Sequence, residues 1–476
     1  MREVVIGKEI ADVDRQNVLH PFSVLSAHES TGPRRMIVGG EGVRVSDDRG
    51  RSYIDAMAGL WCTNVGYGRS EIAEAMRDQA TRLHYYHGFS SMATDVPALL
   101  AERILSVAPP GMSKVFYGTS GSDANDTQIK LVRLYNNLLG RPEKKKIISR
   151  DRGYHGVSLA AASLTGLASL HANFDLPLPG FLHTRAPYRL WEAREREDDS
   201  AFSARLAAEL DELISREGSE TVAAFIAEPV QAAGGVIVPP EGYFEAIQPV
   251  LRRHDVLLIA DEVVCGFGRV GAWFASERFG IKPDLITVAK GITSAYAPLS
   301  ACIVSDDVWR VLSERGGSRV FGHGYTYTAH PVCAAAALAN LDILEREGLL
   351  DRATASGELL LRRLRESVQD KPYVAEVRGT GLLAAVEFAT ERDPLRRFDP
   401  AGSFAARVTQ ECLERGVITR ALPEADTISF SPPFTISAEE IEEVVAAVGQ
   451  AVDAAARSEA AQRQDGALQA GRPGTH

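Results

Sequence analysis

Short, largely apolar segments recur through the middle of the chain, and a helix-like pattern separates each one from the next. Runs of this kind are typical of strands that are buried on both faces of a parallel sheet. The alternation of strands and helices therefore predicts an α/β domain. The predicted strands are Lys114–Tyr117, Lys146–Ser149, Val222–Ala227, Val256–Ala260 and Leu285–Ala289.

The chain has 476 residues, which is enough for a large domain and a smaller one. Near Pro331 the pattern changes to a long Ala- and Leu-rich helix, followed by mixed helix and strand patterns. The tail is polar and poor in bulky apolar residues, which favours disorder. We predict an N-terminal segment that joins the small domain (1–75), a large α/β domain (76–335), a small α+β domain (336–455) and a disordered tail (456–476).

The composition excludes several classes of protein. A formal net charge of -11 argues against general nucleic-acid binding, which usually needs a basic surface. No signal peptide and no apolar stretch long enough to span a bilayer are recognised, so a cytoplasmic protein is expected. The five cysteines are scattered, which fits free thiols in a reducing compartment. They are Cys62, Cys265, Cys302, Cys333 and Cys412.

Three of the predicted strands end in charged residues. Glu228 follows the strand at 222–227, Asp261 follows the strand at 256–260, and Lys290 follows the strand at 285–289. Parallel strands place their carboxyl ends at a common edge, where ligands of open α/β sheets usually bind. A lysine and an acid at that edge can also form a simple salt bridge, so these residues alone do not establish a site.

Two further segments suggest a phosphorylated, planar ligand. The stretch from Tyr117 to Asp123 is rich in Gly, Ser and Thr and lies between a strand and a helix. Its backbone N–H groups, the helix N-terminus and the Ser120 and Ser122 hydroxyls could bind an anion. Tyr154 follows another strand and could lie flat against a planar group. Pyridoxal phosphate needs a lysine, an acid, an aromatic face and a phosphate site, so it uses all these pieces together.

Several ordered motifs resemble those of the class III, fold-type I aminotransferases that depend on pyridoxal phosphate, the ω-transaminase family. The resemblance extends from about His20 to Val448. It implies a large domain with a mainly parallel sheet of the seven-stranded type and a smaller α+β domain. The motifs are GLWCTNVGYG (59–68), YGTSGSDAND (117–126), GYHG (153–156), EPVQAAGGV (228–236), ADEVVCGFGRVG (260–271), TVAKGI (287–292) and HGYTYTAHPVC (323–333).

The resemblance also implies roles for individual residues. Lys290 would carry the cofactor and move a proton, and Asp261 would pair with the pyridine nitrogen. The other implied contacts are Ser120, Gly121 and Ser122 at the phosphate, Tyr154 and Val263 on the two faces of the ring, Glu228 beside Asp261 and Tyr154, and Thr326 at the phosphate of the neighbouring subunit's cofactor. The last contact implies a homodimer, or a dimer of dimers, with shared sites.

Two departures from other class III members indicate the amine–pyruvate branch. Ala233 stands where ornithine- and aminobutyrate-type members have a second glutamate, and Val264 stands where they tend to have Gln. Phe22, Trp61 and Phe89 would then line an apolar substrate pocket. Arg420 resembles a mobile arginine that pairs with the carboxylate of pyruvate or alanine, a task that suits a guanidinium.

The function implied is transfer of an amino group from a primary amine or ω-amino acid to pyruvate, giving alanine. The expected mechanism is ping-pong and alternates between the pyridoxal and pyridoxamine forms of the cofactor. An aminomutase, a decarboxylating aminotransferase and a non-catalytic binding protein are the alternatives. No metal site is expected, because His323 and His330 lie in a Gly-rich loop without a metal-binding pattern.

Overall fold

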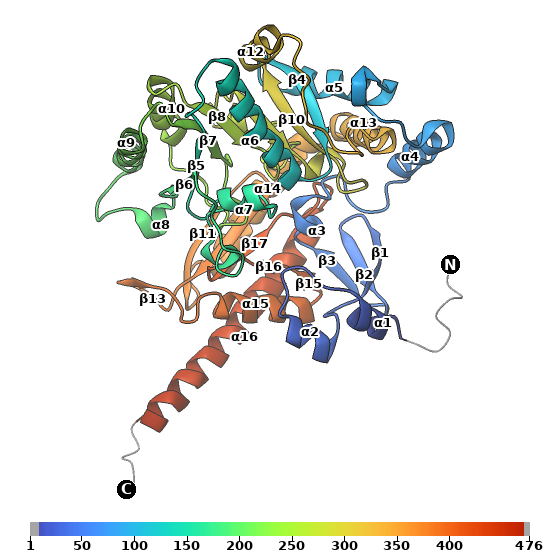
Figure 1. Ribbon diagram of the computed structural model, residues 1–476. Helices are drawn as coiled ribbons and strands as arrows, with labels where there is room; N and C mark the ends of the chain where they lie inside the picture. Colours follow the sequence, from blue (N-terminus) through green and yellow to red (C-terminus); the bar gives the residue numbers. More distant parts are fainter. Residues whose placement is uncertain (1–8, 471–476) are drawn as a thin grey trace.

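A seven-stranded sheet forms the centre of the molecule (Figure 1). The computed structural model describes residues 9–470, with side chains described as far as residue 463. Strand β10 is antiparallel to both of its neighbours, β4 and β9, whereas the pairs from β9 to β6 are parallel. The predicted α/β fold with a mainly parallel sheet is thus confirmed. The strands, in spatial order, are β4 (Met112–Gly118), β10 (Ser300–Ser305), β9 (Leu285–Val288), β8 (Leu257–Asp261), β7 (Val222–Ala227), β5 (Lys146–Arg150) and β6 (Phe181–Thr184).

The strands of this sheet are buried on both faces, which explains their apolar sequences. Every residue of β7, β8 and β9 is buried. In β8, Leu257 and Ile259 belong to one apolar cluster and Leu258 and Ala260 belong to another. Alternate residues of a strand point to opposite faces, so the sheet separates two layers of core.

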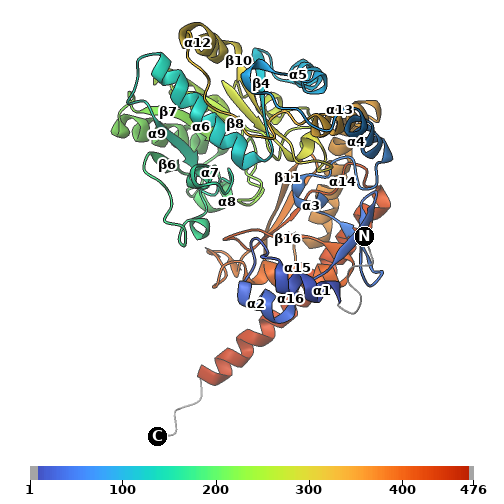
Figure 2. The same cartoon turned by 45° about the vertical axis from the view of Figure 1, so that its right-hand side comes forward.

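Helices pack on both sides of the sheet (Figures 1 and 2). Helix α6 contacts β4, β7, β9 and β10, whereas α5 contacts β4 and α10 contacts β8. The helices of this part are α4 (Ser70–Leu83), α5 (Asp95–Val107), α6 (Gly121–Leu138), α7 (Leu159–Leu164), α8 (Arg189–Glu192), α9 (Asp199–Glu217), α10 (Tyr243–Arg253), α11 (Ala275–Arg278), α12 (Asp306–Gly316) and α13 (Pro331–Arg346). Helix α13 contacts α4 and α5 of the large domain. The predicted domain boundary at residue 335 falls inside this helix, because the helix runs from Pro331 to Arg346.

The N-terminal strands share a sheet with the C-terminal part of the chain. This four-stranded sheet consists of β1 (Ile37–Glu41), β2 (Arg44–Asp47), β3 (Ser52–Asp55) and β15 (Val417–Ile418), and β15 pairs with β3 in parallel. The short helix α3 (Ala58–Trp61) follows β3. We call residues 9–35 the N-terminal arm; it contains α1 (Ile10–Asn17) and α2 (Leu25–Thr31), and neither helix has a buried residue.

The C-terminal part is an α+β layer below the large sheet in Figure 1. It holds a second four-stranded sheet, and α14 and α15 both pack against α16. The elements are α14 (Leu349–Val368), β11 (Val374–Thr380), β12 (Leu383–Phe388), β13 (Glu391–Arg392), β14 (Leu395–Arg396), α15 (Ser403–Glu414), β16 (Arg420–Ala421), β17 (Thr427–Phe430) and α16 (Ala438–Ala470).

Residues 456–470 were predicted to belong to a disordered tail, but this prediction was wrong, because they are helical. Helix α16 continues to Ala470 and projects from the body of the protein (Figure 1). The segment is poor in bulky apolar residues, but its Ala, Glu, Gln and Arg residues are strong helix formers. Glu459 also accepts a hydrogen bond from Arg463 one turn later, at 2.8 Å. Residues 471–476 lie outside the described part of the chain.

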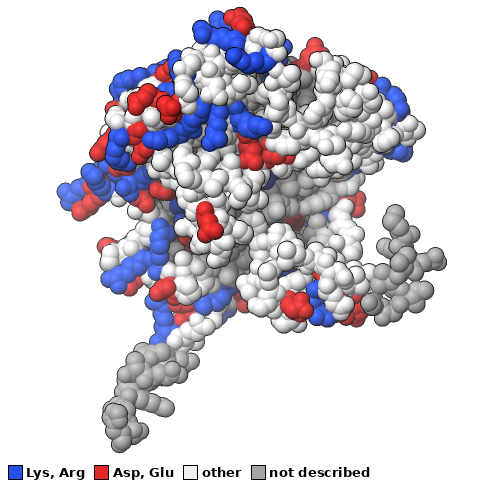
Figure 3. Space-filling model, viewed as in Figure 1, with Lys and Arg blue, Asp and Glu red and all other residues white. Residues whose placement is uncertain are grey.

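Charged side chains are distributed unevenly on the face seen in Figure 3. Lys, Arg, Asp and Glu gather on its left side, whereas a broad area around α5 at the upper right shows few of them. Between residues 9 and 470, none of the helices has an apolar stretch long enough to cross a membrane.

Candidate active site

Lys290 lies at the carboxyl edge of the large sheet, two residues after the end of β9. It begins a short 3₁₀ turn (Lys290–Ile292) and has a φ of 47°, in the left-handed region. That conformation costs a non-glycine residue roughly 1–2 kcal/mol, and such strain often occurs at functional sites. The buried Asn340 amide stabilises the turn, because its Nδ2 donates to the Gly291 and Ile292 carbonyls at 2.9 and 3.0 Å.

The Lys290 amine faces a cavity of about 620 Å³. Among the described residues it forms neither a hydrogen bond nor an ion pair, and its Nζ lies 5.4 Å from the centre of the Trp61 ring. The simple salt bridge with Asp261 or Glu228 that the sequence left open is therefore not formed. Burial lowers the pKa of Lys290, which favours the neutral, nucleophilic amine.

Asp261, at the end of β8, is the best-anchored acid of this cavity. Its Oδ2 accepts a hydrogen bond from Asn125 Nδ2 and lies against His155 Nδ1, both at 2.8 Å. Its Oδ1 accepts from the Val263 backbone N–H at 3.1 Å. The carboxylate is 3% exposed, so these donors replace its hydration and fix its direction.

Asn125 and His155 were not among the predicted site residues. Both stand inside the motifs at 117–126 and 153–156, and Asn125 lies one helical turn after Gly121 on α6. This i, i+4 spacing places Asn125 and Gly121 on the same face of the helix, a signal that could have identified it. His155 gave no such signal, because only the fold brings the end of β8 against the loop after β5.

The N-terminus of α6 opens into the same cavity. Gly121 and Ser122 line it, and Ser122 Oγ accepts a hydrogen bond from the Val157 backbone N–H at 3.1 Å. Ser120 is instead the N-cap of α6: its Oγ accepts from the Asp123 N–H at 3.2 Å, and the side chain is not part of the cavity wall. Helix N-termini bind anions, so this end of the cavity can accept a phosphate.

Tyr154, Glu228 and Val263 complete the wall around Asp261. The Tyr154 backbone N–H donates to Glu228 Oε1 at 2.9 Å. Burial raises the pKa of the Glu228 carboxyl and of the Tyr154 phenol. Gly121 lies close to Val263, because a Cβ at Gly121 would approach the Val263 methyl groups to within 3.1 Å.

The predicted substrate residues Phe22, Trp61 and Arg420 line the same cavity. Trp61 is 5% exposed, and the Arg420 guanidinium lies 5.2 Å from its ring centre. In the described part of the chain the Arg420 guanidinium has no hydrogen-bond or ion-pair partner, and burial lowers its pKa. Ala233 and Val264 also line the cavity.

Phe89 and Thr326 lie away from this cavity. Phe89 begins a 3₁₀ turn (Phe89–Ser91) and lines a second groove of about 1060 Å³, together with residues 320–324. The Thr326 carbonyl accepts a hydrogen bond from the Tyr85 hydroxyl at 2.7 Å. Phe89 and the segment that contains Thr326 therefore lie near each other, and neither residue lines the cavity that contains Lys290.

The donors and acceptors of the cavity fit pyridoxal phosphate. One space is lined by the Lys290 amine, which has no partner among the described residues, by the Asp261 carboxylate with its fixed direction, by the aromatic side chain of Tyr154 and by a helix N-terminus. A Cβ at Gly156 would lie 2.6 Å from Ser122 Oγ, so the phosphate end has room only for glycine at that position. These are the groups that this cofactor requires.

Comparison with known proteins agrees with this fit. The model of the family "Aminotransferase class-III" matches residues 25–452. The chain is 50% identical to the diaminobutyrate–2-oxoglutarate transaminase of Halomonas elongata, over 97% of this chain and 99% of that one. It is 41% identical to the putrescine–pyruvate aminotransferase of Pseudomonas aeruginosa, over 94% and 96%.

A solved structure extends the similarity to three dimensions. The ω-transaminase of Pseudomonas jessenii in complex with PMP superposes with a TM-score of 0.92 at 42% identity, covering 94% of this chain and 99% of that one. Class III aminotransferases are enzymes of fold type I, use pyridoxal phosphate and act on an amine donor and an oxo-acid acceptor. The chain belongs to the class III aminotransferases.

Proposed function

We propose that Lys290 carries pyridoxal phosphate and that the enzyme transfers the amino group of a primary amine or ω-amino acid to pyruvate. The observation that carries the first part is the half-buried Lys290 amine, which has no partner among the described residues and shares one cavity with the anchored Asp261. When bound, the cofactor supplies a carbonyl that condenses with amines and a protonated ring that accepts electrons from the substrate carbon.

The side chains of the cavity would divide this work. Asp261, held by Asn125 and His155, would place its carboxylate against the ring nitrogen and so stabilise the ring's proton. Tyr154 and Val263 would hold the ring between them, and the α6 N-terminus with Gly121 and Ser122 would hold the phosphate. Lys290 Nζ removes a proton from the substrate carbon and returns it, a role that its lowered pKa favours.

Arg420 supports pyruvate as the acceptor. Among the described residues that line the cavity, Lys290 is the only Lys and Arg420 is the only Arg. With Lys290 engaged by the cofactor, one guanidinium remains for one carboxylate, which suits a monocarboxylate such as pyruvate. Ala233 offers no carboxylate to hold Arg420 aside, so the guanidinium is free to bind or to withdraw when an uncharged amine enters.

The relatives define the competing acceptor. One relative is named for pyruvate and another, at higher identity, is named for 2-oxoglutarate. A dicarboxylate would need a second cation, and a neighbouring subunit could supply it.

A homodimer with shared active sites is also part of the proposal. Phe89 lines the second groove, near the segment that contains Thr326. Val320 on the rim of this groove is 91% exposed, and the surrounding surface near α5 shows few charges (Figure 3). A second copy that covers the groove would bury this apolar surface and bring Phe89 and Thr326 to its own cavity.

The experiment follows the cofactor absorbance of the holoenzyme mixed with an amine donor alone. A transaminase stops after one half-reaction, so the long-wavelength absorbance falls by one equivalent and stays low. We expect pyruvate to restore it at least about tenfold faster than 2-oxoglutarate at equal concentration. Faster recovery with 2-oxoglutarate would reject the acceptor, and repeated turnover without any acceptor would indicate an aminomutase and reject the transaminase.

A further inference from the structure

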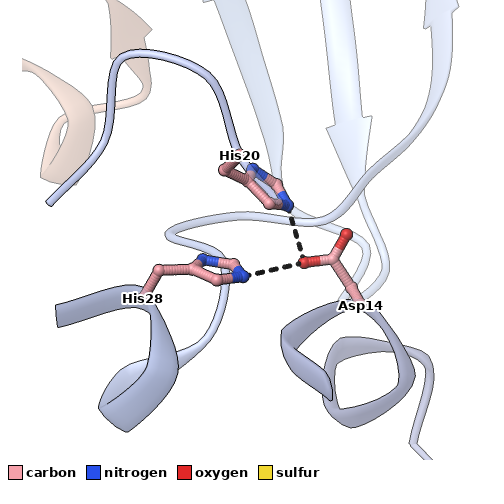
Figure 4. Close-up of side chains that lie close together, drawn as sticks. All are labelled: Asp14, His20 and His28. Carbon is pink, nitrogen blue, oxygen red and sulfur yellow. Dashed lines mark hydrogen bonds and ion pairs between the residues drawn. The ribbon is translucent and has the colours of Figure 1, made fainter. Parts of the chain in front are cut away.

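Two histidines and an aspartate of the N-terminal arm point at one another (Figure 4). Asp14 belongs to α1, His28 belongs to α2, and His20 lies in the loop between them. One ligand atom from each residue lies within 4.8 Å of the other two. The two imidazole rings lie close together, with their centres 4.2 Å apart.

The distances between these atoms suit a divalent transition-metal ion. His20 Nε2 lies 2.8 Å from Asp14 Oδ1, and His28 Nε2 lies 3.5 Å from the same oxygen. Ligands of tetrahedral Zn²⁺ stand about 2.0–2.1 Å from the metal and hence roughly 3.3 Å from each other. The observed separations lie on either side of that value, and imidazole with carboxylate is a common ligand set for zinc.

Hydrogen bonding alone leaves this cluster incomplete. Asp14 Oδ1 is engaged by His20, and the buried His28 Nε2 has no hydrogen-bond partner among the described residues. Buried polar atoms are normally paired, so an orphan nitrogen that points at a carboxylate needs an explanation. An ion between the three groups would satisfy both Nε2 lone pairs and the carboxylate at once.

No apolar core fixes the arm, and its two helices are linked by polar contacts such as the hydrogen bond from Arg15 Nη1 to the Glu29 carbonyl, at 3.2 Å. Helices α1 and α2 are eight and seven residues long and have no buried residue. Helices this short are marginal on their own, and here no hydrophobic core compensates. Metal binding can supply the missing folding free energy, because a site that exists only in the folded arm couples the two processes.

We infer that Asp14, His20 and His28 bind one zinc-like divalent ion, with water as the fourth ligand, and that this ion fixes the arm. Pro21 and Phe22 directly follow His20 and line the mouth of the Lys290 cavity. The ion would therefore set where Phe22 stands, a consequence that rests on the proposed function. The binding of the ion itself does not depend on that function.

Zinc titration of the full-length holoenzyme tests the site. The protein is first treated with a chelator, the chelator is removed, and Zn²⁺ is added in competition with a chromophoric chelator. We expect about one zinc ion per chain. Asp14→Asn and His28→Ala should each weaken binding at least about 10- to 100-fold, since even outer-shell changes have effects of that size. The exposed His84→Ala is the matched control and should bind zinc like the wild type.

A second readout keeps the test independent of catalysis and of the fold of the variants. Zinc should slow tryptic cleavage after Arg15 in the wild-type and His84→Ala proteins at least about fivefold, but not in His28→Ala. Wild-type binding no tighter than that of His28→Ala, or cleavage that zinc does not change, would overturn the site. Failure of the transaminase assay would leave these zinc results as they are.

Discussion

The carboxyl edge of the large sheet and the N-terminal arm both face the same cavity, but they hold their side chains by different means. At the sheet edge Asp261 accepts hydrogen bonds from three directions, and Asn340 stabilises the turn that begins at Lys290. In the arm Phe22 is 60% exposed and lies between two helices without buried residues. The residues proposed to act on the cofactor would thus be held rigidly by the protein core, whereas the arm that carries Phe22 can adjust to the substrate.

Lys290→Ala should give the largest effect, because it removes the amine of the cavity that can act as base and cofactor attachment. We expect turnover to fall at least about 10⁴-fold while the protein still takes up cofactor at its phosphate end. Steady-state rates and the cofactor absorbance after gel filtration measure the two quantities. The exposed Lys282→Ala, on the same segment, should keep its activity; residual activity above about 1% in Lys290→Ala would contradict the assignment.

Asp261→Asn should rank second. The amide preserves the size of the side chain but removes the charge that would face the ring nitrogen, so we expect a loss of about 10²–10³-fold in kcat. Asn125→Ala removes one of the donors to Asp261 and should lose less. The two variants are compared by single-turnover rates at saturating cofactor. An equal or larger loss in Asn125→Ala would show that Asp261 does not act through its charge.

A matched pair of leucines tests the difference in packing. Leu285 on β9 is 0% exposed and Leu19 in the arm is 79% exposed. Leu285→Ala should lower the free energy of unfolding by about 2–5 kcal/mol through the lost burial and the cavity that remains. Leu19→Ala should change it by less than about 0.5 kcal/mol. Denaturant midpoints measure both, and similar shifts would erase the contrast between the two regions.

Arg420→Ala should affect the two half-reactions unequally. A hydrogen bond to a charged group contributes about 1.5–3 kcal/mol, so kcat/KM for pyruvate and alanine should fall roughly 10–100-fold. An aryl-alkylamine has no carboxylate and should be affected less than about threefold. Arg415→Ala is the control, since Arg415 pairs with Glu411 on the surface of α15. Equal losses for both substrates would refute the switching role.

Phe22→Ala should give the smallest change. The side chain is largely exposed at the mouth of the cavity, so we expect KM for a bulky amine to rise less than about tenfold and kcat to stay within about twofold. Initial rates over a range of amine concentrations separate the two constants. A large fall in kcat would mean that the arm is as firmly positioned as the sheet edge.

Local patterns predicted much of this structure. The strand predicted at 222–227 coincides with β7, and the long Ala- and Leu-rich helix predicted near Pro331 is α13, which begins at Pro331. Such segments are predictable because a buried strand needs apolar residues throughout. Strands β6 and β10 were not predicted, although every residue of β10 is buried. Lone short apolar runs are ambiguous until their neighbours in the sheet are known.

The sequence by itself determined the class of fold, the family and the residues gathered at the sheet edge, because these depend on periodicity and on motifs that are local in the chain. Only the tertiary structure decided that Lys290 has no ion-pair partner among the described residues, that His155 and Asn125 hold Asp261, and that Ser120 caps α6 instead of lining the cavity. It also brought Asp14, His20 and His28 together. These facts depend on distances between segments that come together only in the folded chain. No local sequence pattern encodes such distances.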